Sequence, residues 1–299
     1  MKPVWLFMAL GATITGMAMA NPPKASGVPA TSATPDDQYL WLEDIHGTKS
    51  MDWVHAQNAV TQKAFMESLE FDKTRGEILE VLDSEARIPI VHRRGDYLYN
   101  FWQDKAHPRG VWRRTTMAEF EKADPKWETV LDIDALNQAE GKKWVFKGAE
   151  CMKPDYVHCL VSLSPGGGDA VEVREFDLPS KSFVKDGFFL PVAKTEVGWI
   201  DANHVYVGTD FGPGSMTKSS YPRIVKEWTR GTPLSSAKLV YEGKPDDLTV
   251  GASYDRTKGF ERDYVGVQQD FYHREIFLRK DGHLAKLDLP SDADFSTDR

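Results

Sequence analysis

The 299-residue chain has only two cysteines, which excludes a disulfide-dense scaffold and a Cys-rich zinc module. It has no run of Lys or Arg, and 37 basic against 45 acidic residues leave a net charge of −8. Such an acidic chain is a poor binder of nucleic acid or of an anionic membrane surface, and we expect neither as a partner. Beyond the N-terminal leader, no apolar stretch approaches the roughly 18 residues that a membrane span needs.

The N-terminus has the pattern of a signal peptide. Lys2 precedes an apolar run over residues 4–10, and Ala18-Met19-Ala20 supplies the small-x-small pattern that signal peptidase accepts. We therefore predict a signal peptide over 1–20 and an exported protein, periplasmic or secreted, with an uncleaved anchor as the alternative. Residues 21–37 are rich in Pro, Ser, Thr and Ala, which predicts a flexible linker.

A helical segment is predicted over residues 38–86. Residues 48–84 contain no proline, and Trp53, Val60 and Ala64 recur at helical spacing. A second short helix over about 73–82 carries further apolar residues. So short a segment cannot bury this apolar surface by itself, so we expect another part of the protein to cover it.

From residue 87 onward the chain repeats a pattern of short strands. Each unit has a polar turn that opens an apolar strand, then a second strand and a closing strand. The four openings are Asp96-Tyr97-Leu98, Asp155-Tyr156-Val157, Asn203-His204-Val205 and Asp263-Tyr264-Val265. Four units of about four strands are typical of β-propeller blades. We therefore predict a mostly β fold, with a partial propeller over 87–299 after the short helical segment.

Several stretches resemble the prolyl oligopeptidase family of serine peptidases. Residues 39–44 (YLWLED), with Trp53-Val54 and Gln57-Asn58, resemble the start of the family's mature chain. Residues 159–169 and 208–226 resemble its blade sequences. The family joins a seven-bladed propeller to an α/β-hydrolase domain on which its N-terminal helices pack. The resemblance implies that residues 38–86 pack on a hydrolase domain missing here, and that the chain is the N-terminal portion of a peptidase.

Catalysis in that family requires a G-x-S-x-G nucleophile elbow, followed along the chain by Asp and His. The nearest string, Pro213-Gly214-Ser215-Met216-Thr217, lacks the flanking glycines. No H-E-x-x-H, P-loop or dinucleotide-binding motif is present either. We therefore predict no catalytic, cofactor-binding or metal-ligating residue in this chain.

Two functions fit these patterns. By resemblance, the propeller restricts access to the missing serine-type catalytic domain, so that short peptides are the substrates. The alternative is a stand-alone exported propeller that binds a protein or a ligand. In the first case blade four would expose an apolar sheet face, and we expect the isolated fragment to self-associate.

A few individual residues carry further predictions. Cys151 and Cys159 lie in consecutive strands, where an oxidising compartment favours a disulfide; two buried thiols are the alternative. Residues 166–169 predict a tight turn rather than an anion cradle. Asp132 and Asp134 are predicted at a strand end with both carboxylates on one face. Packing between blades is predicted for Trp102, Trp112, Trp127, Trp144, Trp199 and Trp228.

Overall fold

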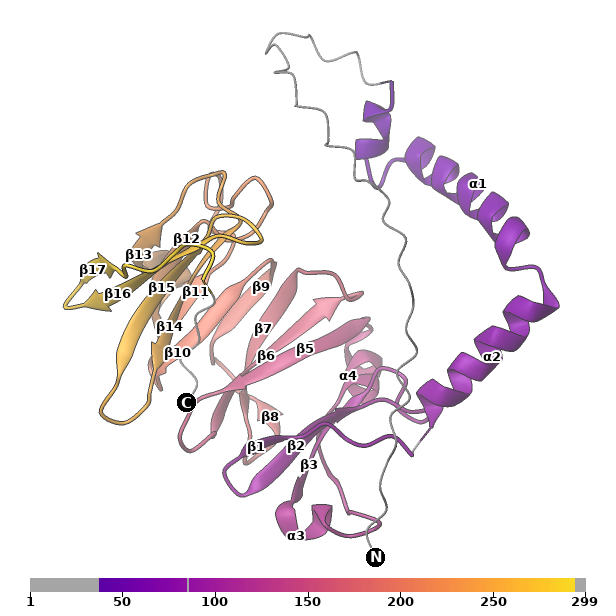
Figure 1. Cartoon of the computed structure of the whole chain (residues 1–299), viewed down its shortest axis with the longest axis horizontal. Coiled ribbons are helices and arrows are strands. Elements are labelled where there is room, and N and C mark those ends of the chain that lie inside the picture. Colours follow the sequence, from indigo (N-terminus) through magenta and orange to yellow (C-terminus); the bar gives the residue numbers. More distant parts are fainter. Residues whose placement is uncertain (1–37, 85, 294–299) are drawn as a thin grey trace, which may run out of the picture. The chain divides into compact units, whose positions relative to one another are not determined.

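The computed structural model describes residues 38–84 and 86–293 (Figure 1). The predicted signal peptide over 1–20, the predicted linker over 21–37 and the tail 294–299 lie outside the described residues. The chain divides after Lys73 into two compact units, which are described separately below. In the described ranges, no helix is both long enough and apolar enough to cross a membrane.

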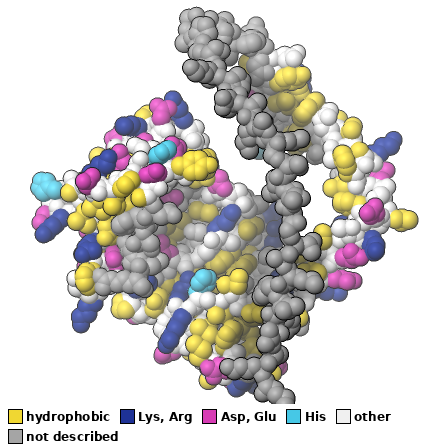
Figure 2. Space-filling view, viewed as in Figure 1, with side chains coloured by type: hydrophobic (Ala, Val, Ile, Leu, Met, Phe, Trp, Pro, Cys, Tyr) yellow, Lys and Arg dark blue, Asp and Glu magenta, His cyan; other side chains and the backbone are white. Residues whose placement is uncertain are grey.

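The first unit is helical and leaves most of its apolar side chains in solvent. It contains η1 (Leu40–Glu43), α1 (Thr48–Phe65) and the beginning of α2 (Leu69–Asp83). The Ser50 hydroxyl donates to the carbonyl of Trp41 at 2.8 Å, which ties η1 to α1. Ser50 is the only buried residue of α1, whereas the Phe65 and Leu69 side chains are 73% and 91% exposed. Apolar side chains accordingly appear along both helices in Figure 2.

The second unit contains four antiparallel sheets whose strands follow one another in chain order (Figure 1). We call them blades 1 to 4. Blade 1 consists of β1 (His92–Arg94), β2 (Tyr97–Trp102), β3 (Val111–Thr116) and β4 (Glu128–Asp132). Blade 2 consists of β5 (Trp144–Cys151), β6 (His158–Pro165), β7 (Val171–Asp177), β8 (Ser182–Phe183) and β9 (Phe189–Ala193).

Blades 3 and 4 have four strands each. Blade 3 consists of β10 (Glu196–Asp201), β11 (His204–Gly208), β12 (Ile224–Thr229) and β13 (Lys238–Glu242). Blade 4 consists of β14 (Thr249–Asp255), β15 (Arg262–Gln268), β16 (Arg274–Lys280) and β17 (His283–Lys286). The connections contain α3 (Met117–Phe120), α4 (Ile133–Glu140) and η2 (Leu234–Ser236).

The predicted repeat coincides with these sheets. Three of the four sequence openings lie at the start of the second strand of their blade, at β2, β11 and β15, and the opening at residues 155–157 lies in the turn directly before β6. The prediction of four sheets after a short helical segment is therefore confirmed. The fourth strand of blade 2 was not predicted in its observed form, because it is divided into two pieces. β8 pairs with the end of β7 and β9 with its beginning, and a loop at residues 184–188 separates them.

The prediction of a strand end is right for Asp132, but the prediction that Asp132 and Asp134 share one face of a strand is wrong. β4 ends at Asp132, whose carboxylate caps α4 by accepting a hydrogen bond from the amide of Ala135 at 2.9 Å. Asp134 lies in the first turn of α4 and accepts from the amides of Arg109 and Gly110. The strand pattern failed because Ile133 begins a helix, where Asp is favoured as the capping residue.

Three apolar clusters hold successive blades together. Between blades 1 and 2, Trp112 packs with its ring centroid 5.8 Å from Phe146 and 5.9 Å from Phe176. Between blades 2 and 3, Phe188 contacts both Trp199 and Trp228. The third cluster joins blades 3 and 4 and is rich in valine.

The tryptophan prediction is confirmed for part of its set. Trp112, Trp199 and Trp228 pack across blade junctions, and Trp144 belongs to the first cluster. It is wrong for Trp102 and Trp127, whose rings flank the Arg113 guanidinium within blade 1. An arginine can cover an aromatic face as well as an apolar neighbour does, which the spacing of tryptophans does not reveal.

Candidate functional site

The first strands of the blades are tied to one another by hydrogen bonds from side chains to the backbone. Arg94 of β1 donates to the carbonyl of Ala149 in β5 at 2.9 Å. Trp199 of β10 donates to the carbonyl of Glu150 in β5 at 3.0 Å, and Arg256, which follows β14, donates to the carbonyl of Trp199 at 3.2 Å. These bonds hold the inner edges of all four sheets in a continuous series.

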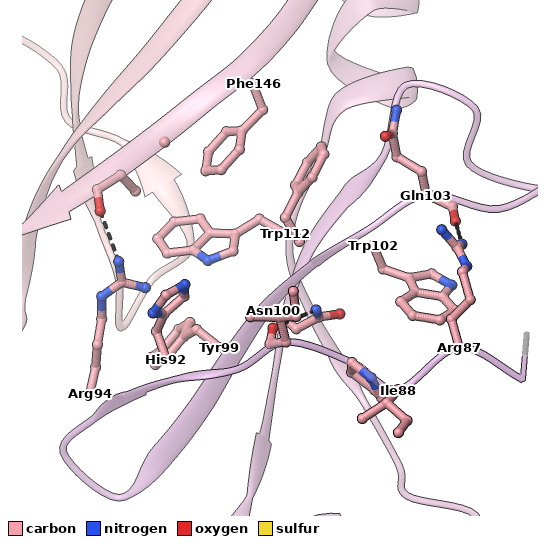
Figure 3. Close-up of a pocket in the computed structure, with 15 residues that line it drawn as sticks. Arg87, Ile88, His92, Arg94, Tyr99, Asn100, Trp102, Gln103, Trp112 and Phe146 are labelled. Carbon is pink, nitrogen blue, oxygen red and sulfur yellow. Dashed lines mark hydrogen bonds between the residues drawn. The ribbon is translucent and has the colours of Figure 1, made fainter. Parts of the chain in front are cut away.

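A cavity of about 590 Å³ lies where blade 1 meets blade 2 (Figure 3). Its walls are largely aromatic, with rings from β2, β3 and β5. Phe101 stacks on Phe146 at a centroid distance of 4.9 Å, and Trp112 lies next to both Phe146 and Tyr99. These walls suit a planar or apolar group.

The charged residues that line this cavity are all basic. They are Arg87 and Arg94, and no Asp or Glu is among the lining residues, which also include His92. The Arg94 guanidinium lies over the rings of Tyr99 and Trp112, 5.2 and 5.6 Å from their centroids. Burial lowers the pKa of Arg94 below its usual range. The cavity therefore combines positive charge with aromatic walls.

The neighbouring gap, between blades 2 and 3, has the opposite character. It encloses about 410 Å³ and is lined by Glu150 and Glu196 together with Lys147. Partial removal from water raises the pKa of both carboxyl groups, although both side chains still reach solvent. In Glu150, the nearby charge of Glu196 adds to this rise in pKa.

A buried ion pair joins blades 2 and 3 farther from the inner edge. The carboxylate of Glu175 in β7 is fully buried against the loop that joins β8 to β9, where the amide of Phe188 donates to it at 2.9 Å. Arg230 forms two bonds to it, at 2.7 and 2.8 Å, and His158 Nδ1 lies 3.1 Å away. Arg230 also donates to the carbonyl of Ala202. The sequence contains a signal that Glu175 is buried, because Glu175 continues the alternation of the buried Val171 and Val173 on one face of β7.

The structure places Cys151 and Cys159 directly opposite each other in β5 and β6 and links them as a disulfide, with their Cα atoms 3.9 Å apart. Cys159 is fully buried, and both residues belong to the cluster between blades 1 and 2. The link therefore belongs to the same apolar cluster as Phe101, Trp112 and Phe146 of the cavity wall.

The remaining sequence candidates serve loops and turns. Ser215 is buried, donates to the carbonyl of Gly212 at 2.7 Å and accepts from the amide of Phe211 at 2.9 Å. The Ser164 hydroxyl closes the predicted turn by donating to the carbonyl of Gly168, while Asp169 accepts from the Tyr221 hydroxyl of blade 3. Within residues 38–84 and 86–293, no group of three or more His, Cys, Asp or Glu is placed to hold a metal ion.

Comparisons with known proteins match this architecture. The family model of the prolyl oligopeptidase N-terminal β-propeller domain matches residues 28–265. An uncharacterized peptidase of Sinorhizobium fredii is 36% identical over 308 residues, covering 97% of this chain and 42% of the relative. An uncharacterized peptidase of Rickettsia prowazekii is 29% identical over 268 residues, covering 85% of this chain and 37% of the relative.

Solved structures have a similar fold over most of this chain. A post-proline cleaving enzyme from Rickettsia typhi has a TM-score of 0.77 and 28% identity, over 84% of this chain and 38% of the enzyme. Oligopeptidase B from Leishmania major shares the fold, with a TM-score of 0.63 and 15% identity over 83% of this chain and 34% of that protein. The chain thus spans less than half the length of the relatives that it matches.

Proposed function

This chain belongs to the prolyl oligopeptidase family and carries its N-terminal β-propeller, and we propose that it gates an exported serine oligopeptidase. In this role the blades border the route to a hydrolase domain and admit short, unfolded peptides. Acylation and hydrolysis take place on that domain, while this chain selects by size. The apolar faces of α1 and α2 would pack against the same domain.

The observation that carries the proposal is the series of bonds between the first strands. Arg94, Trp199 and Arg256 each reach the backbone of a neighbouring blade, so the sheets cannot separate without breaking hydrogen bonds. The pair of the buried Glu175 and the half-buried Arg230 adds to this resistance, because a buried carboxylate that loses its partner is strongly destabilising. A wall of this kind suits a filter that excludes folded proteins.

Two features support export. Residues 1–20 carry the signal-peptide pattern. The link between Cys151 and Cys159 suits an oxidising compartment, where disulfides persist.

The first experiment is the intact mass of the species that contains these residues in the exported fraction of the source organism. We expect a species of about 70–80 kDa, the size of a propeller with a hydrolase domain. A stable species of about 32 kDa, the size of the chain after leader removal, would instead support the stand-alone binding module. Absence of the protein from the exported fraction would contradict export.

A second experiment tests gating in that whole peptidase. A fluorogenic hexapeptide is compared with the same hexapeptide placed in a loop of a folded carrier protein. We expect cleavage of the free peptide only, and Arg230→Met to increase cleavage of the carrier by loosening blades 2 and 3. The matched control is Lys218→Met, because Lys218 pairs with Asp246 in solvent. Equal cleavage of both substrates by the unaltered enzyme would overturn gating.

A further inference from the structure

The cavity between blades 1 and 2 contains an arginine without a carboxylate partner. Arg94 is half-buried, and across the described ranges it forms no ion pair. By contrast, Arg114, Arg230 and Arg279 each pair with a glutamate within 2.9 Å. A guanidinium has five N–H donors, and the bond to the carbonyl of Ala149 uses one of Arg94's. The remaining donors of this half-buried guanidinium are open to the cavity, where they can bind an anion that enters it.

The residues around Arg94 indicate which kind of anion fits the cavity. The rings of Phe101, Trp112 and Phe146 form an apolar wall of the same cavity, and Figure 3 shows Arg94 at one end of it. A small inorganic ion would leave this wall unused. A carboxylate attached to an apolar or aromatic group would use both the charge and the rings.

The charge of the gap between blades 2 and 3 disfavours binding of a carboxylate there. Glu150 and Glu196 line the space between blades 2 and 3, where they repel a carboxylate. Glu150 is the next residue after Ala149, to whose carbonyl Arg94 is bonded. The strand β5 therefore lines both spaces, the cavity with its two arginines and the gap in which two glutamates outnumber Lys147.

We propose that the cavity between blades 1 and 2 binds the C-terminal carboxylate of a short peptide whose last side chain is apolar or aromatic. Arg94 pairs with the carboxylate, and the rings of Phe101, Trp112 and Phe146 receive the side chain. The inference rests on the proposed function, since it takes peptides as the molecules that enter the propeller. Its consequence is a preference for peptides with a free C-terminus.

The test uses the 299-residue chain and the tripeptide Ala-Pro-Phe, titrated by calorimetry as the free acid and as the C-terminal amide. We expect the acid to bind at least about ten-fold more tightly than the amide, because a charged hydrogen bond contributes that much. Arg94→Met should reduce the affinity for the acid to that for the amide. Arg93→Met is the matched control: Arg93 is the exposed neighbour on the same strand and donates to the carbonyl of Gly95.

The comparison of acid with amide on the unaltered chain needs no variant, so a folding defect in Arg94→Met would not obscure the result. Equal affinity for acid and amide, or no binding of either, would overturn the inference. Benzoate that binds as tightly as the tripeptide acid would overturn the peptide as ligand and assign the site to small aromatic acids. These outcomes differ from failure of the proposed function, which the intact mass and the carrier substrate report separately.

Discussion

The junction between blades 1 and 2 and the junction between blades 2 and 3 are formed by corresponding strands of one repeat, yet different forces dominate them. The rings of Trp112, Phe146 and Phe176 pack in the first junction and leave a cavity at its inner edge. The second junction also has an aromatic contact, but it adds a fully buried carboxylate paired with Arg230.

The two junctions differ in how far one blade can shift relative to its neighbour. Rings tolerate some sliding, since offset and edge-to-face arrangements have similar energies. A buried carboxylate with two bonds to one guanidinium tolerates little displacement, because an unpaired charge in the protein interior is very costly. We infer that the second junction fixes the geometry of the propeller, whereas the first is free to accommodate a ligand.

The largest effect is expected from breaking the ionic junction. Arg230→Met leaves the Glu175 carboxylate buried without its countercharge, which should lower the free energy of unfolding by about 3–5 kcal/mol. Urea denaturation followed by tryptophan fluorescence measures the loss. Adding Glu175→Gln to this variant removes the orphaned charge and should restore part of the stability. A loss below about 1 kcal/mol, typical of a surface pair, would show that the pair is effectively solvated.

A substitution in the aromatic junction between blades 1 and 2 should lower the free energy of unfolding by a smaller amount. Trp112→Leu removes a buried ring but keeps an apolar side chain, and we expect the free energy of unfolding to fall by about 2–3 kcal/mol. The same urea titration applies, and Phe271→Leu is the control because Phe271 is 83% exposed. Equal losses for Trp112→Leu and Phe271→Leu would contradict the role assigned to the ring.

The sequence predicted the sheets better than the sites. Four blades were predictable because alternation within a strand and polar turns between strands are local features of the chain. The cavity was not, since Arg94 and Ala149 are 55 residues apart and meet only when two blades pack. The burial of Glu175 could have been predicted, because a carboxylate in line with the buried Val171 and Val173 indicates a buried charge that needs a partner. Nothing in β7 itself identifies Arg230 as that partner.

The disulfide offers a further test of the junction between blades 1 and 2, because it joins β5 to β6 and both cysteines belong to the apolar cluster of that junction. Replacing Cys151 and Cys159 together with serine should lower the free energy of unfolding by about 2–3 kcal/mol, as expected for so short a closed loop. Thermal unfolding with and without reductant provides the measurement. Reductant should lower the melting temperature of the unaltered chain and leave that of the double variant unchanged. A melting temperature insensitive to reductant in both proteins would indicate that the thiols are free.

The smallest effect concerns the carboxyl groups at the inner edge of the second junction. The folded protein raises the pKa of Glu150 and Glu196, so the folded state binds protons more readily than the unfolded chain. Their contribution to stability is therefore fully present below the unfolded pKa, about 4.3, and is lost as the pH rises through the folded values. Replacing both with glutamine should stabilise the protein at pH 7, by less than about 1 kcal/mol because both side chains reach solvent.

Glu140 provides the control of opposite sign for this pH dependence. A hydrogen bond from Arg174 lowers the pKa of Glu140, so its contribution to stability is present at pH 7 and is lost as the pH falls through the folded pKa. Glu140→Gln should therefore destabilise the protein at pH 7. Melting temperatures between about pH 3 and 7 should show the two variants approaching the unaltered chain from opposite sides as the pH falls, with the Glu140→Gln difference fading only below about pH 4.3. A shift of the same sign for both variants would mean that the glutamines act through packing rather than charge. Opposite signs would establish that the inner edge of the second junction carries unpaired negative charge, the counterpart of the unpaired Arg94 at the first.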